Sequence, residues 1–151
     1  MSGALGTMFA TSKTVKTIVL ISCASKKAHH KVKAEDLYIS PLFTGNLRYA
    51  RSLKPDSIFI LSAKYGLLEL DKEVGPYNTT LKDMPSAQVK AWADKVVKQL
   101  KKQADLQSDH FIILAGEKYR KYLVPYLSSY EVPLQGMLIG KQLQYLATQN
   151  T

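Results

Sequence analysis

Serine, lysine and tyrosine side chains follow three short apolar runs, and these residue types suit contact with an anionic or aromatic ligand. The three segments are 22–27 (Ser-Cys-Ala-Ser-Lys-Lys), 62–66 (Ser-Ala-Lys-Tyr-Gly) and 115–119 (Ala-Gly-Glu-Lys-Tyr). Small residues let a backbone approach a ligand closely and present its N–H groups, and lysine adds positive charge. Segment 22–27 lacks the spaced glycines and terminal Lys-Ser/Thr of a P-loop. It therefore predicts contact with a phosphate or a base, and the alternative is a simple basic turn.

The chain after Gly66 is rich in acids and contains a further tyrosine, Tyr77. After Leu68, a loop of about fifteen residues precedes the next predicted helix, and loops of this length in compact domains are more often functional than accidental. A carboxylate in this segment can orient a water molecule or stabilise positive charge on a sugar, while Tyr65 and Tyr77 can stack on a base. The alternative is that the acids only balance nearby lysines.

The cysteine and the histidines do not predict a catalytic thiol or a metal site. No histidine partner for Cys23 is identifiable from the sequence, and small buried cysteines are common. His29 and His30 are adjacent and point in different directions in regular structure, and His110 begins a predicted strand. A zinc site needs ligands that converge, so no metal and no cofactor are expected.

Three continuous apolar runs must position these segments. They are Thr17–Ile21, Ser57–Leu61 and Phe111–Leu114, and each is rich in β-branched or aromatic residues. Such runs are typical of strands buried on both faces of a parallel sheet. Ligands of open α/β sheets bind beyond the carboxyl ends of the strands, so the three polar segments are expected to share one cleft.

Helical patterns alternate with these strands. Ser40 as N-cap and Pro41 at the first helical position predict one helix, whose apolar residues are Phe43, Leu47, Ala50 and Leu53. Further helices are expected over Ser86–Lys102, from Glu117 to a break at Pro125, and over Leu138–Leu146 with its three leucines inward. A fourth strand is expected at Glu131–Leu134. The alternation predicts one α/β domain.

The length and composition bound the organisation. A chain of 151 residues is most economically a single domain, here residues 17–151, with residues 1–16 as a flexible leader or an expression remnant. No apolar run approaches the roughly 20 residues that span a membrane. The lone Cys23 cannot form an internal disulfide and suits the reducing cytoplasm.

The charge indicates an anionic partner. Lysine and arginine number 21 against 12 acids, a formal net charge of +9. Lysines concentrate in segments 13–33 and 90–102, which contain a single acid, Asp94. Excess positive charge favours polyanions through phosphate contacts and counterion release, so nucleic acid is the expected partner. Solvated surfaces are the alternative for these lysines.

As a set, several motifs resemble the DUF6884 family of small bacterial and phage proteins. They are Cys-Ala-Ser-Lys-Lys at 23–27, Ala-Glu-Asp-Leu-Tyr-Ile-Ser-Pro-Leu-Phe at 34–43, Leu-Ser-Ala-Lys-Tyr-Gly-Leu-Leu at 61–68, Gly-Pro-Tyr at 75–77 and Thr-Leu at 80–81. The similarity runs from about Ile18 to Leu146. The family is also distantly similar to YaaA-type DNA-binding proteins and to uracil-DNA-glycosylase-like domains.

This resemblance implies a three-layer α/β/α fold, with a mainly parallel sheet of about four strands and a nucleobase or nucleotide cleft at the strand ends. The catalytic residues expected there are Asp71, which would activate water or stabilise an oxocarbenium-like sugar, and Lys64 as electrostatic stabiliser or, as the less favoured role, imine-forming amine. The residues expected to bind the substrate are Ser22, Ser25, Lys26, Ser62, Tyr65, Tyr77, Gly116 and Tyr119.

The leading functional hypothesis is a nucleic-acid-directed enzyme of the N-glycosidase or base-exchange type, acting on a base flipped out of the stack. Two alternatives use the same cleft. One is a DNA- or RNA-binding protein without catalytic activity, and the other is an enzyme that acts on small nucleotides or nucleosides.

Overall fold

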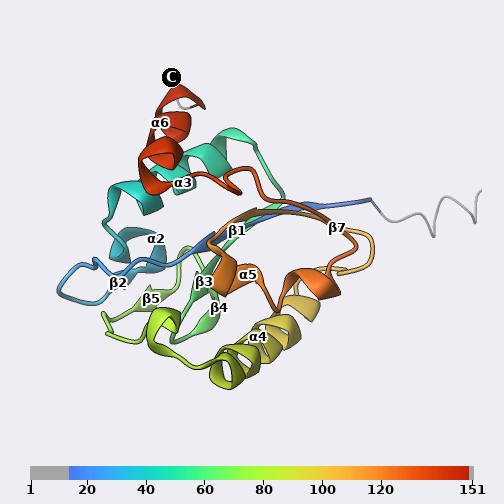
Figure 1. Cartoon of the computed structure of the whole chain (residues 1–151), viewed down its shortest axis with the longest axis horizontal. Coiled ribbons are helices and arrows are strands. Elements are labelled where there is room, and N and C mark those ends of the chain that lie inside the picture. The colour runs from blue at the N-terminus through green and yellow to red at the C-terminus, as the bar shows by residue number, and fades with distance from the viewer. Residues whose placement is uncertain (1–13, 150–151) are drawn as a thin grey trace, which may run out of the picture.

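A five-stranded sheet forms the centre of the computed structural model, which describes residues 14–149 (Figure 1). The strand order is β4-β3-β1-β6-β7, and all neighbours are parallel except β3 and β4. The strands are β1 (Thr17–Ser22), β3 (Ser57–Ser62), β4 (Gly66–Glu69), β6 (His110–Leu114) and β7 (Ser129–Glu131). The prediction of a mainly parallel sheet is confirmed, and the sheet has one strand more than expected.

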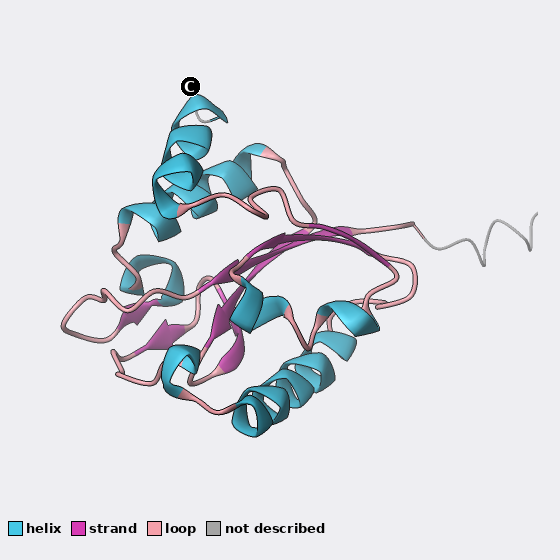
Figure 2. Cartoon of the chain, viewed as in Figure 1, coloured by secondary structure: helices cyan, strands magenta, loops and turns pink. Residues whose placement is uncertain are grey.

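Helices cover both faces of the sheet and produce a three-layer α/β/α fold, as predicted (Figure 2). The helices α3 (Pro41–Ser52) and α6 (Ile139–Gln149) lie on one face, and α4 (Ser86–Lys101) and the short α5 (Glu117–Arg120) lie on the other (Figure 1). The four apolar residues 18–21 of β1 are fully buried, because β1 is the middle strand and lies between two helical layers.

The signals read from the sequence at α3 and α4 are confirmed, except that Leu53 is the C-cap of α3 and is 38% exposed. Oγ of Ser40 accepts a hydrogen bond from the Phe43 N–H at 3.2 Å, and Pro41 occupies the first helical position of α3. The α4 residues expected to face inward are all buried, and they are Val89, Trp92, Ala93, Val96, Val97 and Leu100. An apolar stripe at helical spacing therefore positions α4 against the sheet.

The chain between β6 and α6 departs from the predicted elements. The helix from Glu117 ends at Arg120, before the expected break at Pro125, and a short 3₁₀ helix follows at Val124–Tyr126. The last strand is Ser129–Glu131 rather than Glu131–Leu134. Pro133 has no N–H to donate to a ladder, which limits extension of the last strand past Val132.

The C-terminal helix α6 packs on α3 through fewer leucines than expected. Leu146 is buried, but Leu138 precedes the helix and is 80% exposed, and Leu143 is 37% exposed. A Cβ placed on Gly45 of α3 would lie 3.3 Å from Cδ1 of Leu146, so the small residue permits this close helix contact.

The segment after β3 is more ordered than the predicted loop. Gly66 adopts φ of +76°, the left-handed conformation that glycine favours, and the chain reverses into β4. A second, two-stranded sheet follows from β2 (Val32–Lys33) and β5 (Glu73–Val74), beside α2 (Ala34–Leu37). The remaining 3₁₀ helix, Leu81–Asp83, leads toward α4.

The start of the fold lies one residue before the expected boundary. The Lys16 N–H donates to Oδ1 of Asp109 at 3.0 Å, and the Lys16 carbonyl accepts from the His110 N–H. Residues 1–13 of the expected leader lie outside the described residues. Within residues 14–149, none of the helices has the length and apolar character needed to cross a membrane.

Candidate functional site

The carboxyl ends of β1, β3 and β6 meet at one edge of the sheet, on the left of Figure 1. The register places Ser22 beside Leu61 and Ile21 beside Leu114. Two cavities lie at this edge. One cavity, of about 370 Å³, is lined by the segment that follows β1, beginning at Cys23, and by the segment around Tyr77; it is called here the basic cavity. The other, of about 310 Å³, is lined by Ser22 and is called here the amide cavity.

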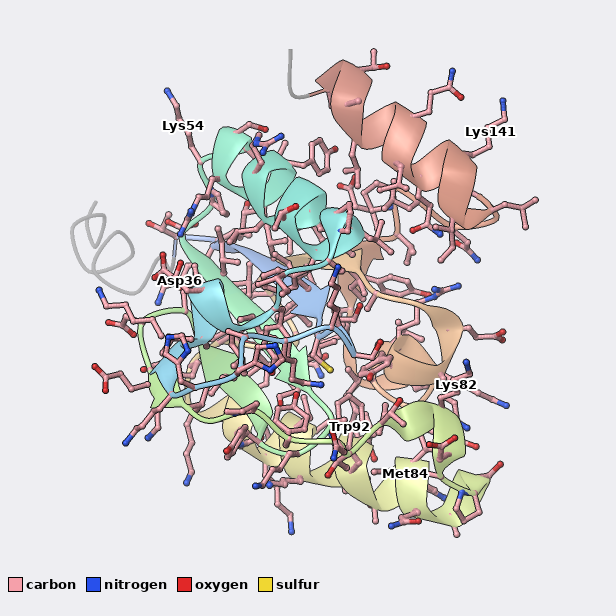
Figure 3. All side chains as sticks on the ribbon, turned by 90° about the vertical axis from the view of Figure 1, so that its left-hand side faces the viewer. Asp36, Lys54, Lys82, Met84, Trp92 and Lys141 are labelled. Carbon is pink, nitrogen blue, oxygen red and sulfur yellow. The ribbon has the colours of Figure 1, made fainter. Side chains whose placement is uncertain are left out.

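The basic cavity contains lysines and hydroxyl groups but no carboxylate. Its residues are Cys23, Ala24, Ser25, Lys27, Tyr77, Asn78, Thr79, Thr80, Lys82 and Tyr119. All of them lie in the described part of the chain, and none is Asp or Glu. The cavity therefore combines positive charge with neutral hydrogen-bonding groups, which is the chemistry that binds an anion. Figure 3 looks onto this edge and shows Lys82 and Trp92 on its α4 side.

Lys27 is the half-buried cation of this cavity. Its Nζ lies 4.3 Å from the ring centroid of Tyr77 and 3.4 Å from the Ser25 carbonyl oxygen. Burial lowers the pKa of the Lys27 ammonium, and the charge of Cys23 opposes that shift. No described carboxylate forms an ion pair with Lys27. An aromatic ring face and a carbonyl compensate only part of the hydration that burial removes.

Three hydroxyl groups form a buried chain beneath the basic cavity. The hydroxyl oxygens of Tyr38 and Tyr77 lie 2.6 Å apart, and Oγ of Ser62 lies 2.8 Å from the Tyr77 hydroxyl. Oγ of Ser62 also accepts from the Tyr65 N–H at 3.0 Å. Burial raises the pKa of Tyr38 to about 12 and raises the pKa of Tyr77 further in the same direction.

The burial of the hydroxyl chain restricts how the rings of Tyr77 and Tyr65 can contact a ligand. Tyr77 is only 8% exposed, and the Tyr65 ring packs edge-on against it at 5.6 Å between centroids. With Lys27 on its ring, Tyr77 has a cation at the position where a base was expected to stack. Its position fixes Lys27 instead.

Tyr119 closes the side of the basic cavity nearest α4. Its hydroxyl lies 3.3 Å from Sγ of Cys23, and the Trp92 ring packs edge-on against its ring at 5.6 Å. Burial raises the pKa of Tyr119 above its ordinary value. Trp92 in turn donates its indole N–H to the Ser62 carbonyl at 2.8 Å. Through this one side chain, α4 contacts both the end of β3 and Tyr119 of α5.

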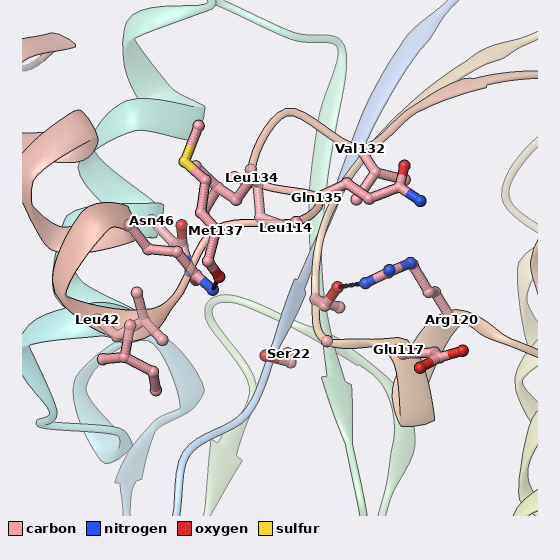
Figure 4. A pocket seen from close by; sticks show the side chains of 15 residues that line it. Ser22, Leu42, Asn46, Leu114, Glu117, Arg120, Val132, Leu134, Gln135 and Met137 are labelled. Atoms are coloured by element: carbon pink, nitrogen blue, oxygen red, sulfur yellow. Dashed lines mark hydrogen bonds between the residues drawn. The ribbon is translucent and has the colours of Figure 1, made fainter.

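The amide cavity lies between α3, α6 and the end of β6 (Figure 4). Asn46 of α3 lies on one side, and Glu117 and Arg120 of α5 lie on the other. Arg120 is fixed by donation from Nη1 to the Ala115 carbonyl at 2.8 Å. On the α6 side, Gln142 donates to the Met137 carbonyl at 2.9 Å.

Most of the predicted substrate-binding residues come to this edge, but they divide between the two cavities. Ser22 and Gly116 line the amide cavity. Ser25, Tyr77 and Tyr119 line the basic cavity. The others line neither one: Ser62 is buried in the hydroxyl chain, Tyr65 is half-buried beside it, and Lys26 is exposed.

The structure does not bring the two predicted catalytic residues together. Lys64 lies just after β3 at the site edge, exposed, with Nζ 5.3 Å from the Tyr65 ring centroid. Asp71 lies beyond Glu69, which pairs with Phe59 near the start of β3. Because β4 runs antiparallel to β3, it carries Asp71 away from the carboxyl edge. The shared cleft of Lys64 and Asp71 is therefore not formed.

Several residues of the two cavities received no individual role from the sequence, among them Asn46, Glu117, Arg120 and Lys82. Asn46 had a signal: it lies within the apolar stripe of its helix, three residues after Phe43 and four before Ala50. A polar residue at such a position is buried and needs a partner.

Across residues 14–149, no group of three His, Cys, Asp or Glu side chains is arranged to hold a metal ion.

Comparison with known proteins agrees with the motifs. Residues 18–148 match the family of unknown function DUF6884. The chain is 32% identical over 117 residues to the uncharacterized protein YfjM of Bacillus subtilis (strain 168), an alignment that covers 72% of this chain and 75% of that protein. No solved structure matches the chain. Because the family match spans nearly the whole sheet and its helices, the chain belongs to the DUF6884 family.

Proposed function

We propose that this protein is a base-processing enzyme that acts on nucleic acid at the carboxyl edge of its sheet, by N-glycosidic hydrolysis or base exchange. The observation that carries the proposal is the half-buried Lys27 ammonium, which lies in a carboxylate-free cavity with no described ion-pair partner. A partly desolvated cation is costly unless an anion binds beside it, so this cavity favours a phosphate group.

Several exposed lysines favour a polymeric source of that phosphate. Lys26 and Lys64 follow β1 and β3, and Lys118 of α5 donates to the Lys82 carbonyl at 3.1 Å. They extend the positive charge of the basic cavity along the same edge, in a protein of net charge +9. A charged path of this kind suits successive phosphates of a nucleic-acid backbone.

The proposed chemistry needs a carboxylate close to the sugar. In hydrolysis, the water oxygen bonds to C1′ as the C1′–N bond breaks, the bonding electron pair leaves with the base, and the base takes up the proton that the water releases. In base exchange, a second base takes the place of water. The sugar carries positive charge in the transition state, which a carboxylate stabilises. Glu117 is a carboxylate at this edge, whereas Asp71 lies beyond the far end of β4.

The resemblance of the family to YaaA-type DNA-binding proteins and uracil-DNA-glycosylase-like domains supports the same proposal. The first group of proteins binds nucleic acid, and the second group cleaves the bond between base and sugar, which is the chemistry proposed here. The polar edge and the three-layer fold of this chain are compatible with either one.

The test is to incubate the protein with DNA and RNA oligonucleotides, unmodified and base-modified, and to identify released bases by mass spectrometry. We expect release that is lost in Glu117→Gln while binding is retained. The roles predicted for Lys64 and Asp71 are tested in the same assay with Lys64→Ala and Asp71→Asn. Full activity of both variants removes them from the catalytic machinery.

Binding is measured separately, by fluorescence anisotropy across a salt series. Lys27→Met is expected to weaken binding to all sequences and to reduce the salt slope by about 1, as loss of one phosphate contact does. Lys141→Met, an exposed lysine of α6, is the matched control. Salt-sensitive binding without any released base assigns a DNA- or RNA-binding role, and tight binding of mononucleotides alone assigns a small-molecule enzyme.

A further inference from the structure

We infer that the amide cavity binds an uncharged nucleobase, and that the carboxamide of Asn46 is its buried hydrogen-bonding partner. The inference rests on the proposed function, because it assigns the base to one cavity and the phosphate to the other. It has its own physical support in the polarity, shape and charge of the amide cavity.

Asn46 provides the first support. It is 3% exposed and lines the cavity, and its Oδ1 has no hydrogen-bond partner among the described residues. Buried polar atoms in folded proteins are nearly always paired, and an unpaired one carries the full cost of its lost hydration. A carboxamide offers an acceptor beside two donors, which matches the paired donor and acceptor positions on the edge of a base.

The walls of the cavity suit a flat ring. Leu42, Leu114 and Met137 contribute apolar surface from α3, β6 and the segment before α6. The volume of about 310 Å³ lies at the lower end of the roughly 300–1,000 Å³ range of small-molecule sites. A cavity of this size, apolar with a few fixed polar groups, has the composition of a site for a compact heterocycle.

The charges distinguish this cavity from the basic one. Its lining contains one carboxylate, Glu117, and one guanidinium, Arg120, so their formal charges cancel. The basic cavity has Lys27 and Lys82 and no acid. A neutral lining with opposite charges on its rim favours an uncharged polar ligand, whereas the lysines favour an anion.

Residues that are adjacent in the sequence line the two different cavities. Ser22 lines the amide cavity and the next residue, Cys23, lines the basic cavity. On α5, Glu117 lines the first and Tyr119 lines the second. The end of β1 and the short α5 therefore supply residues to both cavities, so a base and a phosphate of one nucleic acid can both bind at this edge of the sheet.

The test titrates the four uncharged ribonucleosides into ¹⁵N-labelled protein and follows the backbone amide signals. We expect at least one nucleoside to bind, with the largest shifts at Gly116, Glu117 and Met137. Asn46→Leu should weaken that binding at least tenfold. Lys141→Met, at an exposed lysine of α6, should leave it unchanged, and Lys27→Met should weaken binding of ribose 5-phosphate.

A second variant serves in case Asn46→Leu does not fold. Gly116 lines the cavity, and a Cβ added there meets no atom within 4 Å. Gly116→Phe has room for its first side-chain atom, and its ring is expected to reduce the space for a ligand; the thermal unfolding midpoint of the variant checks that it is folded. The inference is overturned if no nucleoside binds at millimolar concentration, if the shifts map to the basic cavity, or if both variants bind nucleosides as well as the original protein does.

The two proposals fail in different ways. Nucleic-acid binding and base release without nucleoside binding in the amide cavity overturn only the present inference. Nucleoside binding that depends on Asn46, in a protein that neither binds nor processes nucleic acid, overturns the proposed function and retains the base site.

Discussion

The hydroxyl groups of Tyr38 and Tyr77 lie 2.6 Å apart in the protein interior, and they connect two segments that the sequence separates by 39 residues. Tyr38 follows the short α2, and Tyr77 follows β5. Their contact, extended to Ser62, joins both segments to the end of β3. The floor of the basic cavity therefore depends on a chain of neutral hydroxyl groups.

Removal of the middle hydroxyl should destabilise the protein. Tyr77→Phe leaves the buried Tyr38 hydroxyl without its 2.6 Å partner and deprives Ser62 of one hydrogen bond. We expect the free energy of unfolding to fall by about 1–3 kcal/mol, measured by urea denaturation. Tyr130→Phe, at a 45% exposed residue of β7, is the control and should change stability by less than about 0.5 kcal/mol. Equal effects of the two variants contradict a structural role of the hydroxyl chain.

Stability should fall at alkaline pH because folded Tyr38 retains its proton. Burial raises the pKa of Tyr38 to about 12, whereas the unfolded side chain titrates near pH 10. Between those values the folded state binds more protons than the unfolded state, so the contribution is complete below about pH 10 and is lost as the pH rises toward 12. The expected slope is roughly 1.4 kcal/mol per pH unit for one such tyrosine.

Urea denaturation between pH 9 and 11.5 measures this slope. Tyr38→Phe should make it shallower, and Tyr130→Phe should not alter it. An unchanged slope in Tyr38→Phe shows that other groups account for the pH dependence.

Gly66 should not tolerate a side chain. Its φ is +76°, and an added Cβ would lie 2.3 Å from Oε1 of Gln99, which accepts from the Leu67 N–H. We expect Gly66→Ala to cost about 1–3 kcal/mol from backbone strain, with a further cost if the Gln99 hydrogen bond breaks. Gly75→Ala is the matched control, since it has neither positive φ nor any atom within 4 Å of the new Cβ. Chemical denaturation of both variants gives the comparison, and equal stabilities contradict the prediction.

Asn46 should be less favourable to stability than an apolar residue of similar size. Its Oδ1 is buried without a described partner, so Asn46→Leu removes an unsatisfied acceptor and adds apolar contact with the core. We expect the free energy of unfolding to rise by about 1 kcal/mol. A fall of similar size indicates that Asn46 supports the fold instead of a ligand. The thermal unfolding midpoints of Asn46→Leu and of the original protein are compared, and a higher midpoint for the variant indicates the expected rise in stability.

The main elements of the fold could be predicted from the sequence because they have strong local signals. Continuous β-branched runs located β1, β3 and β6, and the Ser40–Pro41 pair located the start of α3. The strand β4 has only four residues, and nothing local distinguishes it from a loop. It forms because β3 offers a free edge, and that edge exists only in the assembled sheet.

The sequence predicted at which edge of the sheet the candidate site lies, but not which residues line each cavity there. The rule that ligands bind beyond parallel strand ends placed Ser22, Ser25 and Gly116 at one edge of the sheet, and in the structure they line cavities there. It did not show that neighbouring residues face different cavities. Nor did it show that β4 would carry Asp71 away, because that position depends on the antiparallel register of a strand that was not predicted.

The place of β1 in the sheet has a consequence for how the chain folds during synthesis. Among the strands of residues 14–149, β1 is the first to leave the ribosome, yet it is the central strand and needs a neighbour on each side. The β3 partner begins 39 residues after Ile18, and the Lys16 N–H reaches Asp109 only 93 residues later. Until β6 is synthesised, β1 has one unpaired apolar edge, and nascent chains that end before His110 should be the ones that aggregate or recruit chaperones.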